Sequence, residues 1–239
     1  MSEWFKDWFG EVYLELYPHR DEAEAASAVS LLREHGVAQA GTKVLDLACG
    51  AGRHSVPLQA AGARVTGLDL SAVLLKAARS RFKGPLVRGD MRYLPFRAGA
   101  FASVANLFTS FGYFADDAEH TGVLREVARV LEPGGRFALD YLNAPLVRAG
   151  LVTHDHKVVR GKQVTQRRRL SQDGRIVTKT IEIENEPKTF TERVRLFDRE
   201  ELSGMMRAAG FTITEAFGDY RGAPYAPDSP RLLLLARRS

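Results

Sequence analysis

The sequence of 239 residues has little cysteine and no long hydrophobic run. Its single cysteine, Cys49, cannot form a disulfide within the chain, which is typical of proteins of a reducing cytosol. The longest apolar run, residues 232–236, has the length of a strand and is far shorter than the roughly 18 residues of a membrane span. The segment 1–10 mixes acids and tryptophans with apolar residues and lacks a signal-peptide core. These absences predict a cytoplasmic protein without a membrane span or a disulfide scaffold.

The charge balance also lacks a strong excess of either sign. Lysine and arginine number 34 against 29 acidic residues, so the formal net charge is +5. A basic protein can bind anionic partners, nucleic acid included. Most of the arginines are spread along the chain, with the densest run at residues 167–169. Spread charge of this kind is typical of a solvated surface, and by itself it favours no class of partner.

Short apolar runs alternate with helical patterns between residue 21 and about residue 142. Strands that alternate with helices of about ten to fifteen residues are typical of a parallel sheet with right-handed crossovers. The apolar content of 45% and the length of the chain fit one α/β domain. Strands are expected at residues 43–48, 63–68, 85–88, 101–107 and 136–142.

The alternation of strands with helical patterns stops in the next segment. Residues 151–197 alternate apolar and polar positions in several runs, and Asp173-Gly174 is a hairpin signal, so this block predicts a small antiparallel sheet. The helical pattern returns at Asp198, an N-cap with Glu201 at the capping-box position. Two closing strands are expected at residues 211–217 and 232–236.

The most informative stretch, residues 44–54, reads VLDLACGAGRH. It predicts a buried strand followed by a tight turn that needs small residues at Ala48, Gly50 and Gly52. Because side chains are small or missing there, a ligand can lie against the backbone N–H groups at the start of the next helix. The strand before the turn and the helix after it supply the context that a nucleotide site requires. A tight turn without a ligand is the alternative.

Polar residues also fall at the ends of the next three expected strands. Asp69 closes the second strand, where a carboxylate can accept hydrogen bonds from both hydroxyls of a ribose. Asp90 follows the third strand and could accept from an adenine amino group, and Asn106 ends the fourth. A helix cap is the plain alternative for Asp69, and a turn is the alternative for Asp90. Their shared place at the carboxyl edge of the sheet predicts a nucleoside site.

At these motifs the chain resembles the class I S-adenosylmethionine-dependent methyltransferases. The resemblance implies a Rossmann-like seven-stranded sheet in the order 3-2-1-4-5-7-6, with the seventh strand antiparallel and helices on both faces. It also implies S-adenosylmethionine as cofactor and S-adenosylhomocysteine as product. Asp46, which opens the glycine motif, is a family feature that dinucleotide-binding dehydrogenases lack. The matching segments are residues 46–52, 67–71, 89–91 and 124–136.

The resemblance assigns cofactor contacts to the glycine turn, the strand ends and the N-terminal segment. Asp46 would lie near the methionyl part, Asp69 at the ribose and Asp90 at the adenine. For Arg53 and His54, capping of the helix is the alternative role. The expected cofactor-binding residues are Asp46, Ala48, Cys49, Gly50, Gly52, Arg53, His54, Asp69, Leu70, Asp90, Met91, Asn106, Leu107, Tyr13 and Arg20.

The acceptor is the less determined part of the hypothesis. Residues 106–114 read NLFTSFGYF and lack the Pro-Pro signature of the family's amino-methylating enzymes, which we read as evidence against a nucleic-acid acceptor. The aromatic run resembles small-molecule methyltransferases, where it walls the acceptor pocket, although plain core packing accounts for part of it. We expect in-line methyl transfer to a small-molecule acceptor. The candidate catalytic residues are Tyr113, His19 and Tyr141, while a neutral amine would need no base.

Several alternatives stay open. They are an RNA or other nucleic-acid methyltransferase, a non-catalytic cofactor-binding protein and, for the insertion, a dimer interface instead of a lid over the acceptor. Monomer and homodimer are both compatible with the sequence. No metal site is expected, because His154 and His156 alone make a weak ligand set. The expected segments are a helical cap with the first helix (1–36), the cofactor-binding core (37–143), the antiparallel insertion (144–197) and the C-terminal completion of the core (198–239).

Overall fold

The computed structural model describes residues 3–17 and 22–239. Its main sheet has seven strands in the order β10-β11-β5-β4-β1-β2-β3. Strands β1 to β5 run parallel, and β11 pairs antiparallel with both β5 and β10. The strand order predicted from the sequence is therefore confirmed. The strands are β1 (Lys43–Leu47), β2 (Arg64–Asp69), β3 (Leu86–Arg88), β4 (Phe101–Asn106), β5 (Leu131–Leu142), β10 (Phe211–Phe217) and β11 (Arg231–Arg238).

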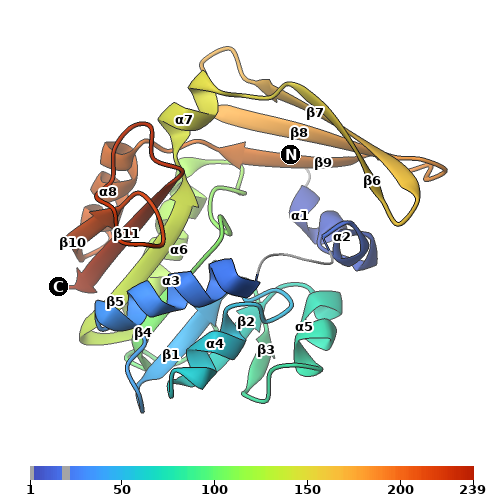
Figure 1. Cartoon of the computed structure of the whole chain (residues 1–239). Helices are drawn as coiled ribbons and strands as arrows, with labels where there is room; N and C mark the ends of the chain where they lie inside the picture. The colour runs from blue at the N-terminus through green and yellow to red at the C-terminus, as the bar shows by residue number, and fades with distance from the viewer. Residues whose placement is uncertain (1–2, 18–21) are drawn as a thin grey trace.

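Helices cover both faces of this sheet, as Figure 1 shows. Alternate residues of β1 serve the two faces: Val44 packs with the α3 and α4 side, and Leu45 packs with the α6 side. Both side chains are fully buried, as expected for a parallel sheet covered on two faces. The helices are α3 (Glu22–Glu34), α4 (Ser55–Ala60), α5 (Ala72–Arg79), α6 (Asp117–Val130) and α8 (Arg199–Ala208).

The insertion forms a separate four-stranded antiparallel sheet in the order β6-β7-β8-β9. Two short N-terminal helices, α1 (Trp4–Trp8) and α2 (Glu11–Leu16), lie between it and the main sheet (Figure 1). Trp8 and Leu16 pack against Val164, Ile181 and Phe190 of the inner face of this sheet. The N-terminal helices and the insertion therefore share one hydrophobic core. The strands are β6 (His154–Val159), β7 (Lys162–Leu170), β8 (Ile176–Ile183) and β9 (Phe190–Arg195).

Two details differ from the expected elements. Strand β5 begins at Leu131, five residues before the predicted start at residue 136. Phe101 pairs with Leu131 and Ser103 pairs with Arg136, so the Pro-Gly-Gly stretch bulges out of a strand that has already begun. The short helix α7 (Ala144–Ala149), which leads into the insertion, was not expected. Across the described ranges, every helix is too short or too polar to cross a bilayer.

Candidate active site

The glycine turn joins β1 to α4 at the carboxyl edge of the sheet. Ala48, Gly50 and Gly52 all have positive φ, at 58°, 54° and 79°. Asp69, at the end of β2, reaches this turn: its Oδ2 accepts a hydrogen bond from the Gly50 N–H at 2.8 Å, and its Oδ1 accepts one from the Ser71 N–H at 2.8 Å. The structure therefore brings together the turn and the carboxylate that the sequence assigns to the ribose.

A second buried carboxylate, that of Asp46, lies on β1 just before the turn. It is 1% exposed, and its Oδ2 accepts a hydrogen bond from Ser55 Oγ at 2.5 Å. Burial, opposed in part by the Ser55 hydrogen bond and reinforced by the charge of Asp69, raises the pKa of Asp46 to about 7. Burial also raises the pKa of Asp69 and of the neighbouring Cys49 thiol. Poorly solvated carboxylates of this kind favour a positively charged ligand.

Asp90 lies beyond β3, with its carboxylate held by Arg92. It accepts hydrogen bonds from the Arg92 backbone N–H at 2.9 Å and from Nη2 at 2.7 Å. Burial alone would raise the pKa of Asp90, but these hydrogen bonds outweigh it and hold the pKa below its usual value. Arg92 also pairs with Glu119 and with Glu3, so it ties Asp90 to the N-terminal segment. Arg92 was not expected from the sequence. Its position two residues after Asp90 was the signal that could have identified it as a partner of that carboxylate. Leu70 and Met91, next to the two strand ends, are half-buried.

Asn106 and Leu107 end β4 with their side chains buried. Asn106 Nδ2 donates to the Leu47 carbonyl at 2.9 Å, whereas its Oδ1 is buried without a hydrogen-bond partner in the described part of the chain. A buried acceptor left unpaired costs about 1–3 kcal/mol. A ligand that donates an N–H at this position would remove that cost, which fits an ammonium group beside the strand end.

Arg53 and His54 follow the glycine turn and contact each other. Arg53 Nη1 pairs with Glu24 of α3 at 3.0 Å, and its guanidinium lies 4.1 Å from the ring centre of Phe108. His54 is buried, with Nε2 at 3.3 Å from Arg53 Nη2. Tyr13 lies farther out, in the aromatic cluster of the N-terminal helices. Arg20, expected to bind the cofactor, and His19, a candidate catalytic residue, lie outside the described residues.

The two tyrosines proposed as catalytic have different surroundings. Tyr113 is half-buried, packs against the Trp4 ring at 4.9 Å and donates its hydroxyl to the Thr109 carbonyl at 2.5 Å. Tyr141 is fully buried, and its hydroxyl donates to the Arg195 carbonyl. Burial raises the pKa of the Tyr141 phenol above its usual value. In this structure the Tyr141 side chain packs in the core, so its catalytic role stays a prediction.

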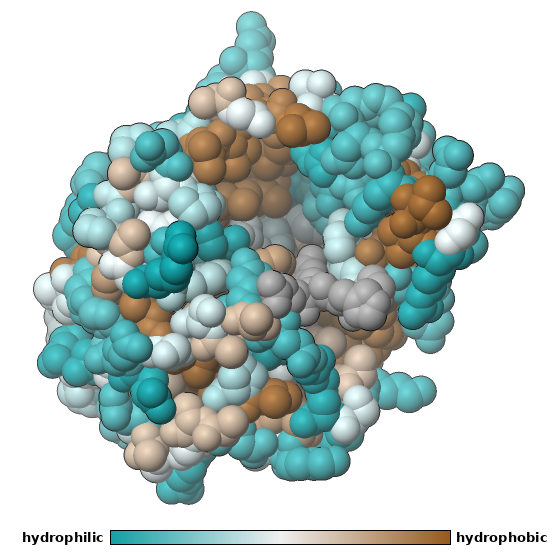
Figure 2. All heavy atoms as spheres, viewed as in Figure 1, coloured by the Kyte–Doolittle hydropathy of each residue, from teal (hydrophilic) through white to brown (hydrophobic). Residues whose placement is uncertain are grey.

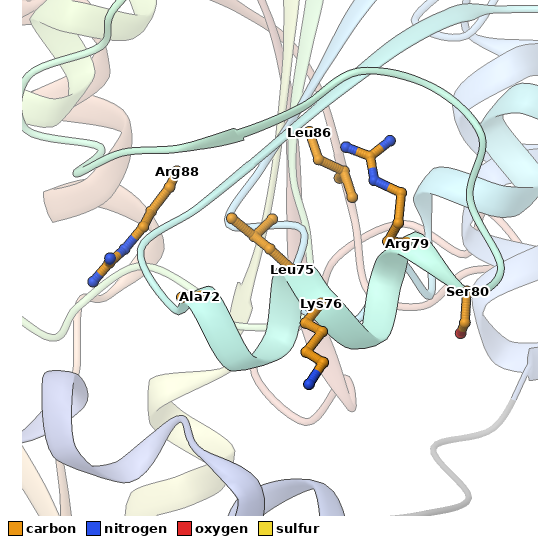
Figure 3. A pocket seen from close by; sticks show the side chains of 7 residues that line it. All are labelled: Ala72, Leu75, Lys76, Arg79, Ser80, Leu86 and Arg88. Carbon is orange, nitrogen blue, oxygen red and sulfur yellow. The ribbon is translucent and has the colours of Figure 1, made fainter.

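The surface near the site is hollowed between the main sheet and the insertion, and apolar side chains gather above the hollow (Figure 2). A separate pocket of about 500 Å³ lies at the outer edge of the main sheet, between α5 and β3 (Figure 3). Three cationic side chains, Lys76, Arg79 and Arg88, surround its apolar floor of Leu75 and Leu86. It contains none of the expected cofactor-binding residues.

Comparison with known proteins gives consistent matches. A family model described as "Methyltransferase domain" matches residues 44–135. Cypemycin N-terminal methyltransferase of a Streptomyces species is 31% identical over 206 residues, which cover 83% of this chain and 84% of that protein. Demethylmenaquinone methyltransferase of Corynebacterium kroppenstedtii is 42% identical over 109 residues, which cover 45% of this chain and only 44% of that protein.

Among solved structures, the fold resembles S-adenosylmethionine-bound CalS10 of Micromonospora echinaspora, described as an amino pentose methyltransferase. The TM-score is 0.70 at 25% sequence identity, and the match covers 96% of this chain and 97% of that one.

Proposed function

The chain belongs to the class I S-adenosylmethionine-dependent methyltransferases, and from that premise we propose that it methylates an amine nitrogen of a small molecule by in-line displacement. S-adenosylmethionine supplies a methyl group already activated by its sulfonium. What is left to the protein is to orient donor and acceptor and to exclude water.

The cofactor fits the residues at the strand ends. In our proposal, Asp69 accepts from the ribose hydroxyls and Asp90 from the adenine amino group. The unpaired Oδ1 of Asn106 accepts an N–H of the methionyl ammonium. The buried carboxylates of Asp46 and Asp69 favour the positive charge of the bound cofactor. The glycine turn leaves its backbone N–H groups accessible to the methionyl part.

The amine assignment is supported by the hydrogen bonds and burial of side chains that could otherwise accept a proton from the acceptor. Tyr113 donates its hydroxyl to a carbonyl, and Tyr141 is buried in the core. The His120 ring accepts from the Phe114 N–H at 3.3 Å and contacts the Asp116 carbonyl at 2.7 Å, so both of its nitrogens are engaged. Within the described residues, these groups are poorly placed to deprotonate a hydroxyl. A neutral amine carries its own lone pair and needs no base.

The names of two relatives point the same way. One is an N-terminal methyltransferase and the other an amino pentose methyltransferase, so both names specify substrates that carry amines. His19 remains the candidate base for a hydroxyl acceptor, because its position lies outside the described residues.

We also propose that the insertion and the N-terminal helices cover the acceptor as one lid. Trp8 Nε1 donates to Glu192 Oε1 of β9 at 2.7 Å, and Lys179 of β8 donates to the Tyr17 hydroxyl at 2.8 Å. The same segment is tied to the cofactor side, where Ser71 Oγ donates to the Phe9 carbonyl at 2.6 Å. These contacts support a cover that closes the hollow against water.

The pH dependence of kcat/KM tests the amine assignment. Two acceptor amines that differ in pKa should give profiles whose rising limbs shift with the pKa of the amine, because the acceptor loses its own proton. A base on the enzyme would instead give one limb for both amines, near the usual histidine value of about 6.5, and His19→Gln would remove it. That second pattern would overturn the proposal.

A further inference from the structure

The turn after β4 has an unusual backbone. Phe108 and Thr109 are consecutive residues with positive φ, at 61° and 59°. The left-handed region is unfavourable for a bulky residue and more so for a β-branched one. Such conformations persist only where the surrounding structure fixes them, and they gather at functional sites. This turn directly follows Asn106 and Leu107, at the place proposed for the methyl donor.

Asp140, on the neighbouring strand β5, fixes the backbone of this turn. Its side chain is fully buried, and its Oδ2 accepts a hydrogen bond from the Phe108 N–H at 2.7 Å. Its main-chain carbonyl accepts a second hydrogen bond from the Thr109 N–H at 3.1 Å. Both left-handed residues are therefore bonded to a single residue of the sheet.

Two further side chains hold the Asp140 carboxylate in place. Arg231 of β11 binds it in a bidentate manner, with Nε at 2.6 Å from Oδ1 and Nη2 at 3.0 Å from Oδ2. Tyr220, in the connection between β10 and β11, donates its hydroxyl to Oδ2 at 2.5 Å. Arg231 Nη2 also contacts Thr109 Oγ1 at 3.2 Å. We call Asp140, Tyr220 and Arg231 the Asp140 network.

The Phe108–Thr109 turn also positions aromatic residues that are expected to line the acceptor pocket. Tyr113 donates its hydroxyl to the Thr109 carbonyl at 2.5 Å, so a movement of Thr109 would displace the Tyr113 ring. The Phe108 ring contacts two guanidinium groups, those of Arg53 at 4.1 Å and Arg231 at 5.3 Å. Donor and acceptor contacts thus meet at one turn.

We infer that Asp140, Tyr220 and Arg231 are positioning residues for methyl transfer, which hold the Phe108–Thr109 turn so that donor and acceptor are aligned. This inference rests on the proposed function, since it places the methyl donor at the end of β4. A misplacement of about 1 Å between reacting groups can cost roughly a hundredfold in rate. The network touches the turn from the side of β5 and β11, so its loss should impair alignment more than cofactor affinity.

Tyr220→Phe tests the network with a minimal change, because it removes one hydroxyl and keeps the ring. Tyr225→Phe is the matched control: Tyr225 is also half-buried in the same connection, and its hydroxyl donates to Asn143 Oδ1 at 2.9 Å. We expect Tyr220→Phe to lower kcat at least about tenfold, which equals about 1.4 kcal/mol, with an unchanged Kd for S-adenosylhomocysteine. Amide hydrogen exchange at Phe108 and Thr109 should become faster. Tyr225→Phe should change none of these.

A merely structural role predicts a different pattern. Equal kcat and equal amide exchange in Tyr220→Phe and Tyr225→Phe would overturn the inference, and so would a parallel loss of kcat and cofactor affinity. If Tyr220→Phe does not fold, Arg231→Lys replaces it, since lysine keeps the charge but cannot bind a carboxylate in a bidentate manner. A wild type that methylates no amine contradicts the proposed function, whereas the exchange comparison still decides whether Tyr220 holds the turn.

Discussion

At the residue scale, the proposed cofactor site contains the two buried carboxylates of Asp46 and Asp69. Asp69 is bound by the N–H groups of Gly50 and Ser71, which aim it along the glycine turn. Asp46 is desolvated more completely and is bonded by Ser55. A cationic ligand nearby would stabilise the charged form of both carboxylates, and each carboxylate can be tested separately.

Asp69→Asn should weaken S-adenosylmethionine binding by about 1–3 kcal/mol, because the amide loses a charge-assisted hydrogen bond to the ribose. Isothermal titration calorimetry measures the change. Asp173→Asn is the control, since that carboxylate also caps a turn but lies at the exposed tip of the β7–β8 hairpin. Unchanged affinity in a folded Asp69→Asn protein would remove the ribose assignment.

The raised pKa of Asp46 predicts that the stability of the protein depends on pH. Folding raises its pKa from 3.8 to about 7, so the folded state binds the proton more tightly than the unfolded state. Stability from this group is therefore present at low pH and is lost as the pH rises from about 4 to about 7. We expect the free energy of unfolding of the wild type to fall relative to that of Asp46→Asn across this window. Urea unfolding of both proteins at several pH values measures this, and a constant difference would contradict it.

Tyr113 should affect turnover more than cofactor binding. Its hydroxyl bonds the Thr109 carbonyl and its ring packs on Trp4, and neither partner is among the residues proposed to bind the cofactor. Tyr113→Phe is expected to lower kcat by about tenfold and to leave the Kd of S-adenosylmethionine unchanged. Steady-state kinetics and calorimetry give the two values, with the exposed Tyr93→Phe as control. Equal losses in both would indicate a packing role.

At the element scale, the sequence predicted the parts of the molecule that repeat a local pattern. Strands followed by helices predicted a parallel sheet, the resemblance at the motifs implied its strand order, and acidic residues at strand ends predicted Asp69 and Asp90 at the carboxyl edge. Strand β5 and helix α7 differ because bulges and short helices leave little periodicity. The Asp140 network was missed because Tyr220 and Arg231 lie 80 and 91 positions away in sequence. Only the pairing of β11 with β5 brings Arg231 to Asp140.

The contact between α1 and β9 gives a prediction at this scale. Trp8 is 1% exposed, and its ring centre lies 4.8 Å from that of Phe190. Trp8→Ala should destabilise the protein by about 3–5 kcal/mol through the cavity it leaves. Trp8→Phe, which keeps most of the packing and loses the hydrogen bond to Glu192, should cost about 0.5–1.5 kcal/mol.

If α1 and the insertion act as one lid, amide exchange in α1 and β9 should rise together in Trp8→Phe. The KM of the acceptor should then increase more than the Kd of S-adenosylhomocysteine. Faster exchange in α1 alone, with β9 unaffected, would show that the two elements move independently and would contradict the shared lid.

At the scale of the whole molecule, two bodies of structure meet around one hollow (Figures 1 and 2). The main sheet presents the glycine turn and the strand ends, and the insertion with the N-terminal helices lies over them. Arg92 and Ser71 join these bodies on the cofactor side through Glu3 and the Phe9 carbonyl. Cofactor binding and closure over the acceptor are therefore expected to be linked.

Amine methylation is tested most directly by transfer of a labelled methyl group from S-adenosylmethionine, followed by mass spectrometry. Matched pairs of small molecules that differ only in an amine or a hydroxyl would be offered, with RNA as a further acceptor. We predict that the amine members gain one methyl group while S-adenosylhomocysteine forms in equal amount. Methylation of the hydroxyl members or of RNA, with the amines unchanged, would contradict methyl transfer to a small-molecule amine.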